Sequence, residues 1–388
     1  MNKQHIVING GGMVGATLAI LLAEQGRQVT VIEASDKDFS QISPEVDLRV
    51  SAISASSQQL LQQVGAWPLI AAQRHCPYMR LSTWQQGGEA LTFDAADIQA
   101  PLLGYIIENQ VVQASLWQVM VQYDTIKVLQ GQGIQSFTNS ASGVMIQLAD
   151  GNELQADLLV GADGAHSFCR QHGGIGITAW DYRQSCMLVH IKTDSVQQDM
   201  TWQEFVSTGP RAFLPLAGQD ASLAWYHQNK TIAQMAQYSN EQLKQAILQE
   251  FAPLKFDFEV VKHGAFPLVR RHAQQYYLDS LVLVGDAAHT INPLAGQGVN
   301  LGFKDVQALA AELLLTDLSH QADKARALAD YQSRRRPDNL LMQTAMDVFY
   351  KGFSCKLPGL SALRQGALTL AQHAGPIKHQ VMKYAMGL

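Results

Sequence analysis

Three glycine-rich segments combine small residues with an acidic side chain. They are Gly10–Gly15 (GGGMVG), Gly161–Gly164 (GADG) and Gly285–Gly302 (GDAAHTINPLAGQGVNLG), and each follows a short apolar run. Such a run is typical of a buried strand. Glycine lets a ligand approach backbone amides, and a carboxylate accepts hydrogen bonds from sugar hydroxyls. The pattern therefore indicates binding of a nucleotide-like ligand where strands end.

The longest segment has the parts of a flavin site. Asp286 follows the apolar run Ser280–Val284 and suits the hydroxyls of a ribityl chain. Gly296 and Gly298 leave room for a flat ring on backbone amides, and a helix begins near Gly298. Its N-terminus carries free N–H groups and partial positive charge, which suit the N1–C2 edge where reduced flavin is negative. A strand–turn–helix without a ligand is the alternative.

The first segment has the order of a dinucleotide-binding unit. A strand at His5–Asn9 leads into G-x-G-x-x-G, a helix follows, and a second strand at Gln28–Ile32 ends in Glu33, 23 residues after Gly10. The glycines let a pyrophosphate approach the helix N-terminus, and the acid accepts from an adenosine ribose. The acid disfavours a 2′-phosphate. This unit by itself does not separate NAD from FAD.

Three further polar residues lie where a ligand is expected. Arg49 stands in the small and apolar stretch Asp47–Ser54, and needs an anionic partner if it is buried. A surface arginine is the alternative. Asn109 begins a predicted helix, where it can cap the helix or reach the ligand. Asp163 is a second carboxylate at a strand end, suited to a ribose or to holding the dinucleotide loop.

One dinucleotide explains all three glycine segments. The first would contact its adenosine end, the second its middle and the third its flavin end. A nicotinamide dinucleotide would not need the third segment. The chain shows no second strand–G-x-G-x-x-G–helix unit, so a separate NADPH domain is not expected. We therefore predict FAD as the bound cofactor.

Composition excludes several other classes. The 388 residues are 47% hydrophobic and 16% charged, with a net charge of −5, so no basic field favours nucleic acid. The four cysteines are scattered, which argues against a disulfide framework, and no metal site is predicted. No apolar run reaches the ~18 residues of a membrane span, and no signal peptide is recognised. We expect a cytoplasmic protein, peripheral at the inner face of the membrane at most.

We predict an α/β fold in which a discontinuous cofactor domain carries an antiparallel substrate region. The cofactor domain comprises residues 1–75, 105–180 and 270–340, the substrate domain 76–104 and 181–269, and a helical C-terminal region 341–388. Within them we expect a helix over 56–75, separate strands at Phe256–Val261 and His263–Leu268, a solvated basic helix end at Arg334–Arg336, and C-terminal helices near Leu360–Ala374 and Pro376–Ala385.

The three glycine segments resemble the fingerprints of group A flavoprotein aromatic hydroxylases, which have the para-hydroxybenzoate hydroxylase fold with a Rossmann-type FAD-binding domain. The resemblance covers almost the whole chain. Finer features resemble the ubiquinone-biosynthesis branch, and the type acting on a 2-polyprenyl-3-methyl-6-methoxy-1,4-benzoquinol in particular. These features are DLRVSAIS (47–54), LLGYIIEN (102–109), QSCML (184–188), GPRAFLPL (209–216), GAFPL (264–268) and KYAMGL (383–388).

The resemblance implies noncovalent FAD, reduced by NAD(P)H as co-substrate, and transfer of one oxygen atom from O2 to an electron-rich ring. It assigns pyrophosphate to the first glycines, the adenosine ribose to Glu33, the flavin or ribityl chain to Arg49, Asn109 and Asp286, and the isoalloxazine to the 293–300 loop. The implied cofactor residues are Gly10, Gly12, Met13, Val14, Gly15, Glu33, Arg49, Asn109, Asp163, Asp286, Pro293, Gly296, Gly298, Val299 and Asn300.

The sequence names no catalytic acid or base. His227 is a candidate proton acceptor on the substrate sheet, with a structural histidine as the alternative, and His289 is expected to support its loop. A soluble phenol would need a charged anchor, for which Arg183 and Arg211 are the obvious residues. A sibling hydroxylase, a reductase and a scaffold subunit remain alternatives. The C-terminal helices could contact the membrane or a ubiquinone-biosynthesis complex, and the sequence does not decide between them. It does not determine the oligomeric state either.

Overall fold

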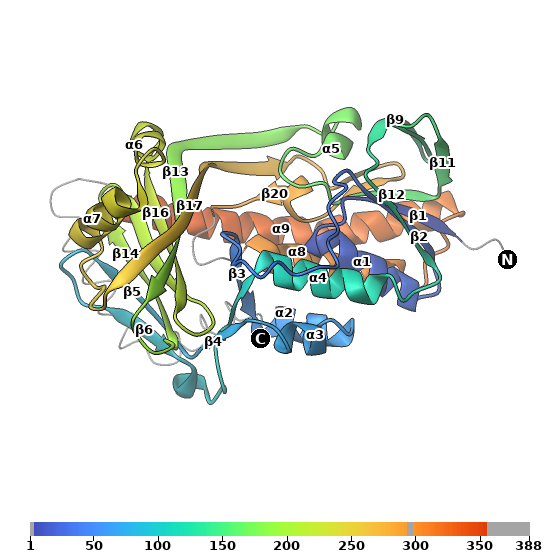
Figure 1. Cartoon of the computed structure of the whole chain (residues 1–388). Helices are drawn as coiled ribbons and strands as arrows, with labels where there is room; N and C mark the ends of the chain where they lie inside the picture. The colour runs from blue at the N-terminus through green and yellow to red at the C-terminus, as the bar shows by residue number, and fades with distance from the viewer. Residues whose placement is uncertain (1–3, 293–297, 355–388) are drawn as a thin grey trace.

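The structure is a computed structural model that describes residues 4–292 and 298–354. It has two lobes that share a long helix (Figure 1). The predicted site residues Pro293 and Gly296, and the predicted helices near 360–374 and 376–385, lie outside the described residues.

A parallel sheet forms the centre of the first lobe. Its order is β18 (Tyr277–Leu278), β19 (Leu281–Leu283), β12 (Leu158–Gly161), β1 (His5–Asn9), β2 (Gln28–Glu33) and β8 (Ile126–Gln130). All neighbouring pairs are parallel except β18 with β19. The strand interiors are apolar because helices cover the sheet. Since β19, β12 and β1 are adjacent and parallel, the three glycine segments leave them at one edge.

Helices and a small sheet enclose this lobe's core. Its main helices are α1 (Met13–Glu24), α4 (Asn109–Met120) and α8 (Gly298–Leu313), with the short α5 (Phe168–His172) beside β12. A separate sheet of β9 (Ile134–Ser140), β10 (Gly143–Leu148) and β11 (Glu153–Ala156) packs its buried side chains against the same core.

A three-stranded sheet lies between the lobes. It contains β3 (Val50–Ser54), β7 (Gly104–Glu108) and β4 (Cys76–Tyr78). The single helix predicted over 56–75 is wrong, because the chain forms α2 (Ala55–Gln63) and α3 (Trp67–Ala71). Gly65 lies between them with φ +76, a left-handed conformation that ends the first helix.

The second lobe is built on an eight-stranded sheet. Its order is β20 (His289–Thr290), β17 (Phe258–Ala273), β13 (Ile177–Thr193), β16 (Asp220–Gln228), β15 (Gly209–Pro215), β14 (Met200–Val206), β5 (Arg80–Gln85) and β6 (Leu91–Asp94). The two strands predicted at 256–268 are one strand, β17. The domain boundaries predicted at residues 180 and 269 fall inside β13 and β17, so these long strands connect the lobes.

The two faces of this sheet have different surroundings. Helices α6 (Asn229–Met235) and α7 (Asn240–Glu250) cover one face, which we call the outer face, and share its apolar core. The opposite face, the inner face, packs against Met346. Because side chains alternate along a strand, each residue of β13–β16 belongs to one face or the other.

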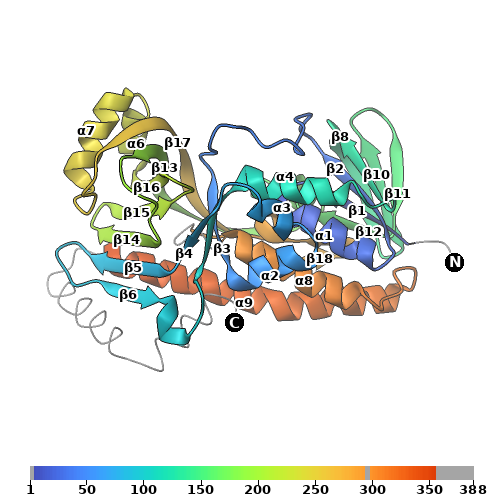
Figure 2. The ribbon, with the colours of Figure 1, turned by 60° about the horizontal axis from the view of Figure 1, so that its bottom comes forward.

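Helix α9 (Gln321–Ser354) runs along both lobes (Figure 2). The predicted helix end at Arg334–Arg336 is therefore wrong, since the helix continues through Pro337, and the predicted domain boundary at 341 falls inside α9. A proline removes one amide donor from a helix. Buried contacts of Arg335 and Asn339 on either side of it hold this turn against the first lobe.

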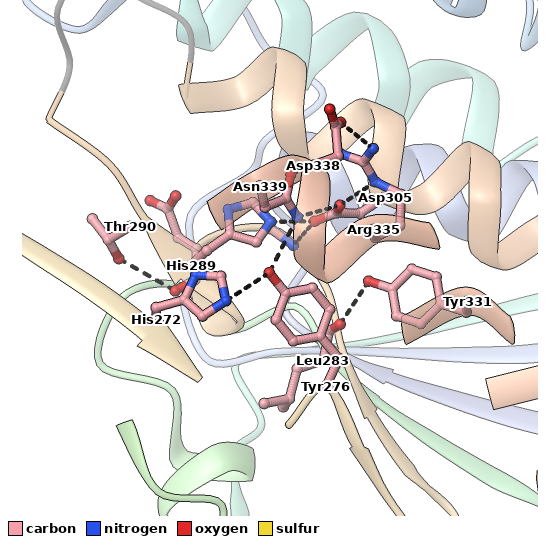
Figure 3. A network of polar contacts seen from close by, with 12 residues as sticks. His272, Tyr276, Leu283, His289, Thr290, Asp305, Tyr331, Arg335, Asp338 and Asn339 are labelled. Atoms are coloured by element: carbon pink, nitrogen blue, oxygen red, sulfur yellow. Dashed lines mark hydrogen bonds and ion pairs between the residues drawn. The ribbon is translucent and has the colours of Figure 1, made fainter. Parts of the chain in front are cut away.

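A buried polar network joins α8, α9 and the third glycine segment (Figure 3). Asp305 of α8 is 0% exposed. Its Oδ2 accepts from the Gly285 N–H at 3.1 Å and pairs with His289, while Oδ1 accepts from Arg335 Nε at 2.8 Å and Asn339 Nδ2 at 3.0 Å. Burial opposes ionisation of Asp305, but His289 and Arg335 outweigh it, so its pKa lies below the usual value.

The network continues into β17 through a buried histidine. His272 shares a hydrogen bond of 2.8 Å with Gln343. It also approaches the Tyr276 hydroxyl at 3.5 Å (Figure 3). The Gln343 amide donates to the carbonyls of Arg271 and Thr290. Burial, and then the neighbouring His289, lower the pKa of His272 to about 4. The imidazole is therefore neutral in the folded protein at neutral pH.

His272 predicts acid sensitivity of the fold. Its folded pKa of about 4 lies below the unfolded value near 6.5, so protonation favours the unfolded chain, and up to about 3 kcal/mol is lost as pH falls through this window. We expect His272→Asn, which keeps a polar group near Nδ1, to flatten the decline of the urea midpoint between pH 6.5 and 4. The same substitution at exposed His166 is the control. An unchanged slope in His272→Asn would contradict the prediction.

Candidate functional site

The first glycine turn is tightly packed on one side and open on the other. A Cβ on Gly15 would lie 2.0 Å from the Gly10 carbonyl oxygen, and one on Gly10 would lie 2.5 Å from the Ala162 carbonyl oxygen. A Cβ on Gly12 would meet nothing within 4 Å. Gly12 precedes α1, whose N-terminus receives no side-chain cap. Free amides therefore face open space, as an anion site requires.

Glu33 lies at the end of β2 beside this turn. Its Oε2 accepts from the Gly11 N–H at 2.8 Å, and its Oε1 accepts from the Ser35 N–H at 3.0 Å. These contacts fix the carboxylate at the edge of the sheet without burying it completely. Glu33 therefore lies next to the glycine turn, as the sequence predicted.

Asp163 links the second segment to the first. Its Oδ2 accepts from Asn9 Nδ2 and from the Cys169 N–H, both at 3.0 Å. Its Oδ1 is buried and has no partner among the described residues. A buried carboxylate oxygen normally has a donor. One oxygen of Asp163 therefore holds the loop, and the other is available to a ligand donor or a water.

The third segment contacts the first through Val14. A Cβ on Gly302 would lie 2.6 Å from Val14 Cγ2, and one on Gly285 would lie 3.3 Å from Val14 Cγ1. Gly285 also has φ +58, which favours glycine. Val14, half-buried like the neighbouring Met13, therefore sets the spacing of α1 and α8. Its side chain acts in packing.

Asp286 and Arg49 are close enough for the charge of the arginine to act on the carboxylate. Asp286 is exposed although Gly285 and Ala287 are buried, so its carboxylate borders open space. Desolvation by the surrounding protein raises the pKa of Asp286, and the nearby charges of His289 and Arg49 oppose this shift. Arg49 is itself exposed. The buried ion pair considered for Arg49 is absent among the described residues, and its guanidinium remains accessible.

Asn109 and Asn300 are held by serines. Asn109 accepts from the Ser51 hydroxyl at 2.7 Å and is the first residue of α4, so the prediction that it caps the helix is wrong. Asn300 is buried, and its Oδ1 accepts from Ser57 Oγ at 2.7 Å and the Ser54 N–H at 3.1 Å. The Asn300 side chain thus fixes the start of α8 to β3.

The remaining predicted positions lie at the start of α8. Val299 is partly buried against the first lobe's core. A Cβ on Gly298 would meet nothing within 4 Å among the described residues. With Asn300 anchored, the N-terminus of α8 is fixed next to β3, on the same edge as the other glycine segments.

Sequence reasoning missed the residues that support the third segment. Asp305 contacts Gly285 and His289, and Arg335 in turn pairs with Asp305. Arg170 donates to the Ala287 carbonyl at 2.9 Å. A lone acid within the apolar stretch of α8 was the available signal, because a buried carboxylate needs partners. The expected supporting role of His289 agrees with its contact to Asp305.

The charged candidates of the substrate region face away from the inner face. Arg211 lies on the outer face, where it pairs with Glu250 and approaches Glu204 at 3.8 Å. His227 follows the same outer alternation as Trp225, and burial lowers its pKa. Arg183 is exposed at a bulge with φ +54. None of these three serves as an anchor or proton acceptor on the inner face.

The aromatic side chains of the substrate region divide between the two faces of the sheet. Trp202, Phe213 and Trp225 belong to the outer core, whereas Phe205 and Tyr226 belong to the inner cluster. Trp180 is 54% exposed and belongs to neither buried cluster. Most of these aromatics are therefore core residues of the sheet.

The residues present fit FAD. Uncapped amides at α1 suit a pyrophosphate, Glu33 and Asp163 offer acceptor oxygens, and Asp286 offers one at the other end of the same edge. Bound there, FAD would supply hydride acceptance and oxygen activation.

Comparison with known proteins agrees with this arrangement. The family described as FAD binding domain matches residues 3–344. The chain belongs to this FAD-binding family. The predicted FAD cofactor and the class of FAD-dependent monooxygenase are confirmed.

Two curated relatives of this family member cover nearly all of it. It is 44% identical over 386 residues to 3-demethoxyubiquinol 3-hydroxylase of Escherichia coli (strain K12), covering 99% of this chain and 98% of that protein. It is 30% identical over 431 residues to ubiquinone biosynthesis monooxygenase COQ6 of Homo sapiens, covering 98% and 92%. The predicted resemblance to ubiquinone-biosynthesis hydroxylases is confirmed.

Solved structures share the fold. PqsL, a probable FAD-dependent monooxygenase from Pseudomonas aeruginosa, has a TM-score of 0.77 at 22% identity, covering 95% of this chain and 100% of that one. p-Nitrophenol 4-monooxygenase PnpA from Pseudomonas putida DLL-E4 has a TM-score of 0.78 at 18% identity, covering 99% and 96%. The predicted fold class is confirmed. Within the described ranges, no helix is long and apolar enough to cross a membrane.

Gly12 and Gly15 predict separable effects on cofactor and fold. Gly12→Ala places a methyl in the open space before α1, so we expect a normal fold with FAD affinity weaker by ~10-fold or more, about 1.4 kcal/mol. Gly15→Ala forces the Gly10 carbonyl to move and should lower stability by ~1–3 kcal/mol or more. FAD titration of apoprotein and thermal unfolding measure the two effects. Wild-type FAD affinity in Gly12→Ala would contradict pyrophosphate binding there.

Proposed function

We propose that this enzyme hydroxylates the ring of a polyprenylated methoxy-methyl-benzoquinol of ubiquinone biosynthesis, using FAD, NAD(P)H and O2. The observation that carries the substrate class is the placement of Arg211. A small charged phenol needs a cationic anchor beside the ring, yet this arginine is engaged by Glu250 on the outer face. The part of the inner face that carries Phe205, Ala224 and Tyr226 is instead apolar, which suits a lipid-tailed quinol. The 3-demethoxyubiquinol 3-hydroxylase relative supports the same class.

We assign the cofactor contacts to the residues at the shared strand edge. Gly12 and the amides of α1 would bind pyrophosphate, Glu33 the adenosine ribose, and Asp286 the ribityl chain. Arg49 and Asn109 would face the flavin, next to the start of α8. We retain the proposed division into a cofactor domain, a substrate domain and a C-terminal region, with the last boundary moved to the end of α9.

A polyprenyl substrate also suggests where the enzyme works. Such a chain partitions into the bilayer, so the enzyme must collect it at a membrane surface or from a carrier. We propose a cytoplasmic enzyme that meets the inner face of the membrane or a biosynthetic partner through the region that follows α9. Flotation of the full chain with liposomes, with and without the prenylated quinol, tests this contact.

The substrate proposal predicts a labelled, coupled reaction. Purified holoenzyme is given NAD(P)H, 18O2 and a demethoxy-type benzoquinol with a short prenyl tail. We expect one 18O atom on the ring by mass spectrometry, and faster flavin reduction when the quinol is present. p-Hydroxybenzoate, a soluble charged phenol, is the comparison substrate and should stimulate neither reduction nor hydroxylation.

Two results would count against it. Hydroxylation of the charged phenol in preference to the prenylated quinol would assign a soluble substrate. Oxidation of NAD(P)H with peroxide as the sole product, across quinols with different ring substituents, would favour a reductase. The position of the label also identifies the ring carbon.

A further inference from the structure

The strand register arranges the inner face in three rows. One row is mostly polar and runs across the sheet as Thr201, Leu214, Ser222, His190 and Lys262. The next is formed largely by small residues and runs as Gln203, Ala212, Ala224, Leu188 and Gly264. The third is bulky and includes Phe205, Tyr226, Cys186 and Phe266. A strip of small side chains thus separates a polar row from an aromatic one.

This strip is accessible and adjoins the cofactor side. Ala212, Leu188 and Gly264 are partly exposed although they lie in the interior of an eight-stranded sheet. A Cβ on Gly264 would lie 3.2 Å from Leu48, the residue before Arg49. Arg49 in turn acts electrostatically on Asp286. A ring lying on the strip would therefore be next to the loop that borders the flavin.

Two polar atoms of the neighbouring row lack partners. His190 is 5% exposed and Ser222 is 2% exposed, and they are directly opposite each other on β13 and β16. His190 Nδ1 and Ser222 Oγ are both buried without a hydrogen-bond partner in the part of the chain that the structure describes. Leaving such atoms unpaired costs about 1–3 kcal/mol each, so a ligand or a water must satisfy them.

Asp220 determines which ring nitrogen of His190 can accept a hydrogen bond. Its Oδ1 lies 2.7 Å from His190 Nε2. A carboxylate accepts hydrogen bonds, so Nε2 is the nitrogen that donates to Asp220, and the tautomer with its proton on Nε2 presents Nδ1 as an acceptor. Asp220 thereby fixes the tautomer. An acceptor at this position recognises a hydroxyl, whose O–H donates, and gives nothing to a carbonyl.

We propose that His190 Nδ1, oriented by Asp220, accepts the hydrogen bond of one ring hydroxyl and so makes the enzyme selective for quinol over quinone. Ser222 Oγ bonds the oxygen of the same group. The inference rests on the proposed function, because it takes a benzoquinol as the ligand. His190 is on the inner face, whereas His227, the candidate proton acceptor named from the sequence, is on the outer face of the same sheet.

Binding of the two redox forms of one ligand tests the proposal. A short-tailed benzoquinol and its quinone are titrated anaerobically, without NAD(P)H, into oxidised holoenzyme, and the flavin spectrum reports each Kd. We expect His190→Leu to weaken quinol binding about tenfold, the value of one buried hydrogen bond, with quinone binding changed less than about twofold. His190→Asn, which keeps an acceptor near Nδ1, should recover part of the selectivity.

Controls separate this role from a structural one. His227→Leu, on the outer face, should leave the ratio of quinol to quinone Kd as in the wild type. FAD content and thermal midpoint are recorded for each variant. If His190→Leu does not fold, Asp220→Asn tests the same point, because it frees the tautomer and should lower selectivity with quinone binding retained.

The outcomes distinguish the two proposals. A wild type that binds and hydroxylates the quinol, with a Kd ratio unchanged in His190→Leu and Asp220→Asn, would overturn the role of His190 and leave the proposed function standing. Equal loss of quinol and quinone binding would assign His190 to packing and overturn its selectivity. A wild type that neither binds nor hydroxylates either form would refute both proposals.

Discussion

The ionised carboxylate of Asp305 is the contact on which the cofactor edge depends. It is fully buried, and it binds the Gly285 amide, His289, Arg335 and Asn339 at once. Burying a charge is costly unless every lone pair finds a donor, so this group constrains all its neighbours. It joins the start of the third glycine segment to α8, which begins within that segment, and to α9. Removing it would leave the buried Arg335 with Asp338 as its remaining carboxylate partner and the Gly285 amide without its acceptor, a larger loss than one hydrogen bond.

Close packing of Val14 against two glycines also holds the cofactor edge in place. Parallel strands bring three glycine segments to one edge, but Val14 between Gly285 and Gly302 determines how near the helices come. Larger residues at either glycine would separate α1 from α8. The side chain of Asn300 then fixes α8 to β3. The open positions at Gly12 and near Asp286 are therefore bordered by parts of the fold that cannot easily adjust.

In the second lobe, side chains that alternate along each strand form two faces with different composition. Its outer face contains the aromatic core and the Arg211–Glu250 pair, covered by α6 and α7. Its inner face exposes small residues beside unpaired polar atoms of His190 and Ser222. Residues adjacent in sequence, such as Ala212 and Arg211, thus have unrelated roles. Stability and ligand recognition can be altered independently on this sheet.

The sequence by itself determined the local units: β1 with its glycine turn, β2 ending in Glu33, the helix Asn240–Glu250 and the start of α8. Period, capping and glycine placement act over a few residues, so they are readable from the chain. Only the tertiary structure shows that His190 lies on the inner face of the sheet, that Arg335 is buried, and that the helix continues through Pro337. These depend on sheet register and on contacts such as Asp305–Arg335, 30 residues apart, which no local pattern encodes.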